Sequence, residues 1–314
     1  MSSSNLLSSL RPLIWASKLF GLLPFTFTKT NNTIKVKTSI FECAYGLCLV
    51  ISVTLFRSIL FHMAEGDSVT YYVFKIGCAI VGVFSVSTIV SYFWYLKTAR
   101  NLHEEALGCI KYISVKNFER KVFWAISFEI LLFWILLELY YILYYFSYPD
   151  EFHKYLIIDL VTESYLRYVI TFINIQFSSV VMCFYFVFMS INQELKSNLR
   201  FVRLGSVLPV KNKMNLIMEN GDISNLVETY EKICRLCKKS NKCFGGSMLI
   251  SAISTFVQIL LSLYYVLVVK EDTPAMFVTW FIYYAIEEWF VLFACESVVS
   301  EVSTPICLTS SVQT

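Results

Sequence analysis

The chain has 314 residues, of which 57% are hydrophobic and only 16% are charged, and its mean hydropathy is +0.61. Soluble domains average about 45–50% apolar and about 25% charged residues, so the composition excludes an ordinary soluble globular protein and indicates an all-α, polytopic membrane protein. The formal net charge of +3 is small, no nucleic-acid-binding motif accompanies it, and we expect no nucleic-acid partner.

The first 38 residues form a basic N-terminal arm. Residues 1–38 contain five Lys and Arg residues and no acid. Their apolar stretch, Leu13–Phe25, is interrupted by Lys18 and Pro24, and no small-residue cleavage site follows. The pattern therefore does not predict a cleavable signal peptide.

Six long apolar runs follow the arm. Each has about 25 residues, more than the roughly 20 that a helix needs to cross about 30 Å of hydrocarbon. We therefore predict a transmembrane helical bundle of six spans in a lipid bilayer. The runs lie near 39–62, 70–95, 122–147, 162–190, 243–269 and 274–298.

The basic residues fall into alternate intervals between these runs. One set of intervals holds 21 Lys and Arg residues and the other holds 2. Cytoplasmic loops retain the basic residues, so the N-terminus is predicted to be cytoplasmic, which argues against a heptahelical G-protein-coupled receptor. The set with 21 basic residues comprises the intervals 1–38, 96–121 and 191–242. The set with 2 comprises the intervals 63–69, 148–161 and 270–273.

The longest polar interval, residues 191–242, is predicted to be cytoplasmic and helical. The fourth span can continue as one helix until Gly205, and a return helix is predicted from about Asp222. A one-sided apolar stripe on the return helix needs a partner, either a neighbouring helix or another subunit. The stripe is formed by Leu226, Tyr230, Ile233 and Cys237.

Residues 299–314 contain no long apolar run. They are predicted to form a divergent C-terminal tail, separate from the bundle.

No constellation of catalytic residues is evident, and we do not expect an enzyme. None of the three histidines has a second ligand at metal-binding spacing. Cys234 and Cys237, with Cys243, suggest a zinc site, but a fourth ligand is lacking, so reduced cytosolic thiols are the favoured interpretation. No metal or cofactor is predicted.

Polar side chains at membrane depth are the informative residues, because an ion in hydrocarbon must be paired, protonated or exposed to water. Glu287 and its neighbour Glu288 fall near the middle of the sixth run. Trp280, Tyr284 and Glu287 lie at i, i+4 and i+7 on one helix face. Two interpretations stay open: these side chains line a polar cavity, or they form buried hydrogen bonds between helices.

The fourth run carries a matching polar face. Arg167, Thr171, Asn174 and Ser178 lie at i, i+4, i+7 and i+11, and such a stripe must face a cavity or neighbouring helices. On the third run, Glu129 and Glu138 are nine residues apart and point to opposite faces. We predict a small-molecule pocket in the outer half of the bundle, with these candidate residues: Glu138, Arg167, Thr171, Asn174, Gln258, Trp280, Tyr284 and Glu287.

Several short motifs together resemble the insect gustatory receptor family. They are the N-terminal Leu10–Leu13 (LRPL) and Gly21–Phe25 (GLLPF), the stretch Cys234–Gly245 before the fifth run, and Cys295–Ser297 (CES) at the end of the sixth. A cytoplasmic N-terminus and a long loop between spans four and five are also similar to that family. The resemblance covers about residues 8–302.

The resemblance implies a plasma-membrane taste receptor of chemosensory neurons. Members are seven-helix, ligand-gated cation channels that assemble as homo- or heterotetramers and bind a small-molecule tastant in an outer-half pocket. Their seventh helix lines the pore and carries a signature in which Thr-Tyr is followed, after about five apolar residues, by Gln-Phe; these 314 residues do not contain that spaced signature. We therefore expect a truncated subunit that does not conduct by itself.

A six-helix transporter of a small solute is the alternative. It would require an internal repeat and helices broken by Gly or Pro at matching positions. Neither feature is evident, and the third and fourth runs contain no Gly or Pro.

Overall fold

The structure, a computed structural model, is dominated by long helices. It describes residues 10–23, 25–30, 33–63, 79, 82–83, 86–87, 90, 94–109, 118–147, 156–205, 213–269 and 274–310. In chain order the elements are α2 (Arg11–Leu19), β1 (Phe25–Thr30), β2 (Thr33–Thr38), α3 (Ile40–Met63), α5 (Leu96–Cys109), α6 (Phe118–Ser147), α7 (Leu156–Gly205), α8 (Lys213–Tyr264), the π-helix η3 (Tyr265–Val269) and α9 (Pro274–Ser310).

The predicted all-α transmembrane bundle is confirmed. Four described helical segments are long and apolar enough to cross a membrane, and they coincide with runs three to six: Val122–Leu143, Ser164–Ser197, Val227–Leu267 and Ala275–Ser303. Helix α3 covers the first run, with a shorter apolar segment at Ile40–Phe56. The second run, 70–95, falls largely outside the described residues, so the count of six spans stays a prediction.

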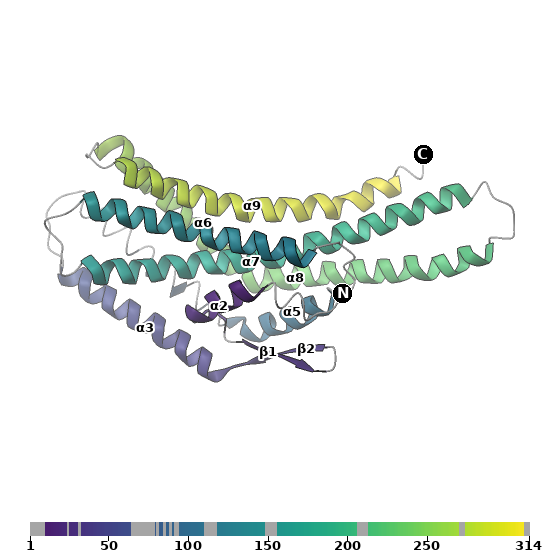
Figure 1. Cartoon of the computed structure of the whole chain (residues 1–314), viewed down its shortest axis with the longest axis horizontal. Coiled ribbons are helices and arrows are strands. Elements are labelled where there is room, and N and C mark those ends of the chain that lie inside the picture. The colour runs from purple at the N-terminus through teal and green to yellow at the C-terminus, as the bar shows by residue number, and fades with distance from the viewer. Residues whose placement is uncertain are drawn as a thin grey trace.

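Helices α6, α7, α8 and α9 lie lengthwise against one another, and α3 crosses below them (Figure 1). On α7 and α9, contacting residues rise in number together, from Arg167 with Tyr284 to Asn192 with Glu301. These two helices are therefore parallel. Phe177 on α7 packs against Phe244 on α8, whereas Phe188, farther along α7, packs against Tyr230, which comes earlier in α8. Helices α7 and α8 are therefore antiparallel. A chain that crosses a bilayer back and forth produces this alternation.

Helices α7 and α8 extend together beyond the end of α6 (Figure 1). Helix α7 ends at Gly205, where the sequence predicted its end. Helix α8 begins at Lys213, not near Asp222, so the predicted loop of 205–221 was too long. The helix continues through Gly221, whose cost of about 1 kcal/mol relative to Ala is small beside the packing of a 52-residue helix.

The described part of the apolar stripe on α8 packs against helices of the same chain; the Leu226 side chain lies outside the described residues. The ring of Tyr230 packs 5.3 Å from that of Phe188 on α7, and its hydroxyl donates to the backbone oxygen of Val302 on α9 over 3.3 Å. Ile233 is completely buried. The partner left open by the sequence is thus a set of neighbouring helices.

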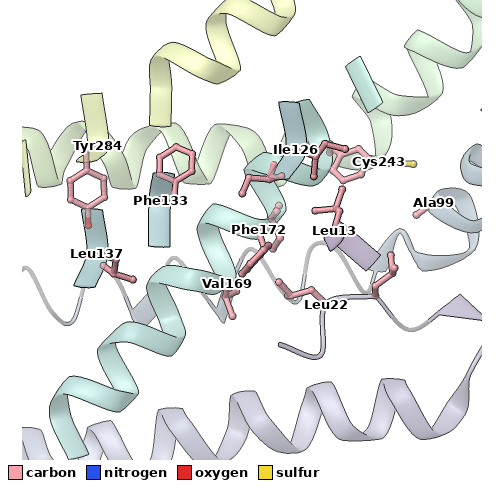
Figure 2. Packing of buried hydrophobic residues seen from close by; sticks show 14 of the residues in the cluster. Leu13, Leu22, Ala99, Ile126, Phe133, Leu137, Val169, Phe172, Cys243 and Tyr284 are labelled. Atoms are coloured by element: carbon pink, nitrogen blue, oxygen red, sulfur yellow. The ribbon is translucent and has the colours of Figure 1, made fainter. Parts of the chain in front are cut away.

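The N-terminal segment packs onto the bundle. The Phe20 ring lies 5.0 Å from Phe172 on α7, and the Tyr165 hydroxyl donates to the Phe20 backbone oxygen over 3.2 Å. Leu13 and Leu22 are buried and lie among side chains of the bundle interior (Figure 2).

A β-hairpin follows α2 and was not predicted. Strands β1 and β2 pair antiparallel from Phe25↔Thr38 to Thr30↔Thr33. The sequence signal for this hairpin is the alternation of apolar and polar residues on both sides of Asn31-Asn32. The backbone N–H of Val36 donates to Glu104 Oε1 on α5 over 2.8 Å, which ties the hairpin to the interval between spans two and three.

Helix α9 does not end with the sixth apolar run. It continues to Ser310 and includes most of the predicted tail. Asn192 Nδ2 on α7 donates to both the backbone oxygen and Oε2 of Glu301, each over 2.8 Å. The end of α9 is therefore anchored to α7.

Replacing Ile233 with Ala should destabilise the α8 contact with α7 and α9. The substitution removes a fully buried side chain, and such changes cost about 2–5 kcal/mol. We expect a clear fall in the thermal midpoint of the detergent-solubilised protein, measured by tryptophan fluorescence. Lys232→Ala, at an exposed neighbouring position, should leave the midpoint nearly unchanged, and equal effects of the two variants would contradict the packing.

Gly46→Ala should loosen the attachment of the N-terminal segment to α3. A Cβ at Gly46 would collide with the backbone of Gly21, which itself has φ of +72°. We expect a loss of about 1–3 kcal/mol, read as a lower thermal midpoint and faster proteolysis of the arm. Gly82→Ala is the control, since no atom of the described residues lies within 4 Å of its added methyl group. A neutral Gly46→Ala variant would be incompatible with this close approach.

Candidate functional site

The polar face of α7 is turned into the bundle. Arg167, Thr171, Asn174 and Ser178 are each at most 4% exposed. The face is thus buried against protein, where Arg167, Thr171 and Asn174 reach partners on a neighbouring helix. Within the described residues, the Ser178 hydroxyl has no hydrogen-bond partner.

Three contacts join this face to α9. Arg167 Nη1 donates to the Tyr284 hydroxyl, and Thr171 shares a hydrogen bond with the Tyr283 hydroxyl. One turn farther along, Asn174 Nδ2 donates to Glu287 Oε1 over 2.9 Å. The structure therefore brings together Arg167, Thr171, Asn174, Trp280, Tyr284 and Glu287 from the predicted site.

Aromatic rings surround the Arg167 guanidinium. Its Cζ lies 3.9 Å from the centre of the Trp280 ring, 5.6 Å from Tyr284 and 5.9 Å from Tyr140. The Tyr140 ring in turn lies 4.5 Å from Trp280, edge to face. Attraction between a cation and ring faces grows when water is excluded, so these rings compensate part of the cost of burying the charge.

One donor in this aromatic group has no partner. The Trp280 Nε1–H is buried and makes no hydrogen bond within the part of the chain that the structure describes. A buried Trp N–H normally finds an acceptor. The arrangement therefore offers an N–H donor beside a guanidinium, in apolar surroundings.

A buried carboxyl group lies deeper on the same side. Glu287 is 2% exposed, and Glu129, a second buried acid on α6, is 8% exposed; the two side chains would repel each other if both were ionised. The adjacent Glu288 accepts a hydrogen bond from Thr255 on α8. The two neighbouring acids of α9 are thus bound to different helices.

Gln258 is buried on α8, and its backbone oxygen accepts a hydrogen bond from the Ser262 hydroxyl over 2.8 Å. The antiparallel contacts of α8 and α9 include Thr255 with Glu288 and the ring stacking of Tyr265 on Phe277 at 4.5 Å. Gln258 therefore lies at a depth between these two contacts.

Glu138 lies elsewhere. It is exposed, its Oε1 accepts from Trp134 Nε1 over 3.2 Å, and it also accepts from the Tyr168 hydroxyl. Tyr168 is on the face of α7 that packs against Phe20 of the N-terminal segment, not on the face of Arg167. Glu138 thus occupies a different side of α7 from the aromatic group.

Tyr140, Tyr283 and Glu129 are not among the site residues predicted from the sequence, where Glu129 was considered only in relation to Glu138. The available signal was helical spacing, since Glu129, Phe133 and Tyr140 share the buried face of α6. Phe133 and Tyr284 both lie in the packed interior that this face adjoins (Figure 2).

No metal site is apparent in the described residues. Among them, no group of three His, Cys, Asp or Glu side chains is placed to hold a metal ion. Cys234, Cys237 and Cys243 are free cysteines.

Comparison with known proteins now identifies the chain's family. A solved structure, the insect olfactory receptor OR5 from Machilis hrabei, is similar with a TM-score of 0.70 over 96% of this chain and 82% of that chain, at 13% sequence identity. No curated protein matches in sequence. The family model described as 7tm Chemosensory receptor matches residues 10–304. The chain belongs to the 7tm chemosensory receptor family.

Proposed function

We propose that this chain is a gustatory-type chemoreceptor subunit of the ligand-gated cation channel class, placed in the plasma membrane with its N-terminus inside. Its ligand is a small-molecule tastant bound in the outer half of the bundle, among α6, α7 and α9. The subunit acts in a homo- or heterotetramer with other receptor subunits. Family membership supports the receptor class, and the motifs near both ends of the matched region favour taste over smell.

The observation that carries the ligand site is the aromatic group around Arg167. A buried guanidinium costs free energy in a membrane protein, and a hydrophobic side chain would pack a purely structural bundle at lower cost. Arg167 and the unpartnered Trp280 N–H are both donors. A small molecule with an apolar body and a hydrogen-bond acceptor fits their combined chemistry.

The form of the helices favours a receptor over the transporter alternative. Transporter sites are typically formed by helices that are interrupted near the middle of the membrane. Helices α6, α7 and α9 are each continuous through their apolar runs. The π-helix η3 lies at the far end of α8, from Tyr265 onward, away from the middle of its span.

Trp280→Ala should weaken both stability and ligand binding. Trp280 is 8% exposed and contacts three other rings or cations, whereas Trp289 on the same helix is 57% exposed. We expect Trp280→Ala to lose about 3–5 kcal/mol of stability and Trp289→Ala much less. The measurement is thermal unfolding of the purified protein, alone and with a panel of bitter, sweet and amino-acid tastants.

A tastant that stabilises the parent protein and Trp289→Ala should not stabilise the milder variant Trp280→Phe, which keeps a ring but lacks the N–H. Equal ligand stabilisation in Trp280→Phe and the parent would refute the assignment of this site.

A further inference from the structure

We propose that α2 and the first turns of α3 form a docking surface for the anionic lipids of the cytoplasmic leaflet. The surface combines an exposed apolar stripe with basic side chains that no acid among the described residues neutralises. It rests on the proposed cytoplasmic placement of the N-terminus, but it does not depend on which tastant binds, or where.

Helix α2 turns one face to the bundle and the opposite face outward. Leu13 and Ser17, at i and i+4, are buried on the inner face. On the outer face, Arg11, Trp15 and Leu19 follow one another at i, i+4 and i+8. Trp15 and Leu19 are 76% and 66% exposed. A helix of nine residues is too short to span a bilayer, and this division of its faces suits a helix that lies at a membrane surface.

The start of α3 continues the outward apolar surface. Ile40 and Phe41 are 86% and 81% exposed, and Phe41 shares a helix face with Tyr45, four residues on. The Tyr45 hydroxyl donates to the backbone oxygen of Leu19 over 3.0 Å. The stripe on α2 and the first turns of α3 are therefore neighbours, and together they form one surface.

Two contacts fix these helices to each other. The backbones of Gly21 and Gly46 approach so closely that neither position has room for a Cβ. Beside this contact, Lys18 Nζ lies 2.6 Å from Glu42 Oε1. Glu42 is the only acid within residues 1–64, and this ion pair neutralises it. The surface thus has no free negative charge of its own from this part of the chain.

Basic side chains border the apolar surface. Arg11 begins the stripe on α2, and Lys37 on β2 precedes Ile40 by three residues. Lys35 lies on the same outward face of the hairpin as Lys37, because the residue between them, Val36, is buried on the other face. Arg11, Lys35 and Lys37 are all exposed, and none forms an ion pair within the described part of the chain. Helices α2 and α3 and the hairpin lie on one side of the long helices (Figure 1).

Charge and position together favour lipid over a protein partner. The cytoplasmic leaflet carries anionic headgroups, which attract basic residues next to a membrane span. Trp and Tyr, here Trp15 and Tyr45, are enriched at the level of the headgroups. Helix α3 covers the first apolar run, so its first turns lie where that run enters the bilayer. A second copy of this chain that offered the same surface would instead place like charges against each other.

Lipid bound here would act on the bundle through α2. Phe20, which directly follows α2, packs on Phe172 of α7 with ring centres 5.0 Å apart. The Tyr165 hydroxyl of α7 also bonds to the Phe20 backbone oxygen. Lipid that holds α2 in place therefore also stabilises its packing on α7, and the charge of the headgroups sets how strongly it does so.

The test is hydrogen–deuterium exchange of the full chain in lipid nanodiscs. Discs of phosphatidylcholine are compared with discs that contain increasing fractions of phosphatidylserine. Exchange reports local opening of the structure, so we expect the amides of α2 to exchange several-fold more slowly as the phosphatidylserine fraction rises. High salt should remove most of this difference, because it screens exposed charges. Soluble glycerophosphoserine, added to phosphatidylcholine discs, should not reproduce it.

Variants locate the basic and apolar parts of the surface. Replacing Arg11, Lys35 and Lys37 together with Gln should raise the half-saturating phosphatidylserine fraction at least several-fold, since each basic residue near an anionic surface strengthens binding roughly five-fold. Trp15→Ala keeps these charges and should speed exchange in α2 in both kinds of disc. These side chains are exposed, so the thermal midpoints of both variants in detergent should equal that of the parent.

The matched control removes three exposed basic residues from α8. Lys232, Arg235 and Lys238 are replaced with Gln, which changes the net charge by the same amount. This control should keep the phosphatidylserine response of the parent. An equal loss of response in the two triple variants would mean that net charge alone is responsible, and it would overturn the proposal.

Four further results would overturn the proposal. They are equal exchange of α2 at every phosphatidylserine fraction, protection by soluble glycerophosphoserine alone, protection only in discs that hold two copies of the chain, and an N-terminal tag accessible from outside intact cells. The third result would mean that a second copy covers the surface. Tastant stabilisation can be measured in phosphatidylcholine discs, so a failure here is distinguishable from a failure of the proposed receptor function.

Discussion

The hydrogen bonds between α7 and α9 are the interaction on which the rest of the structure depends. Arg167, Thr171, Asn174 and Asn192 each bond to α9, at successive depths along two parallel helices. Lipid offers no partners for these groups, so each must be satisfied by another helix. Since these four residues lie along one face, their hydrogen bonds determine both the rotation of α7 and its position along α9.

The same two helices connect distant parts of the bundle. Near one end, α7 and α9 hold the guanidinium among aromatic rings. Toward the other end, Asn192 binds α9 at Glu301, and Tyr230 of α8 bonds to the neighbouring Val302. A change in the contacts around Arg167 that rotated or shifted α9 would therefore also act on the packing of α8. This continuity gives a physical route from the aromatic group around Arg167 to the part of α8 near Tyr230.

Local features of the fold were predictable because they depend on a single segment. Hydropathy located the apolar runs, and Gly205 marked the end of α7 because the stretch before it contains no other Gly or Pro. Features that involve two distant segments were not predictable in the same way. The packing of Phe20 on α7 and the contact of Val36 with Glu104 join residues far apart in the chain, and no local pattern encodes them.

By itself, the sequence determined that α7 has a polar face and that the face must avoid lipid, because spacing and the cost of buried charge follow from residue identity. It also determined which residues of α9 share the face of Glu287. Only the tertiary structure decided which partner each face meets. Glu129, not Glu138, is the acid on the buried side of α6, and Tyr140 joins Arg167. The physical reason is that the inward side of α6 depends on how α6 rotates against α7 and α9, and that rotation is set by packing among several helices rather than by any one of them.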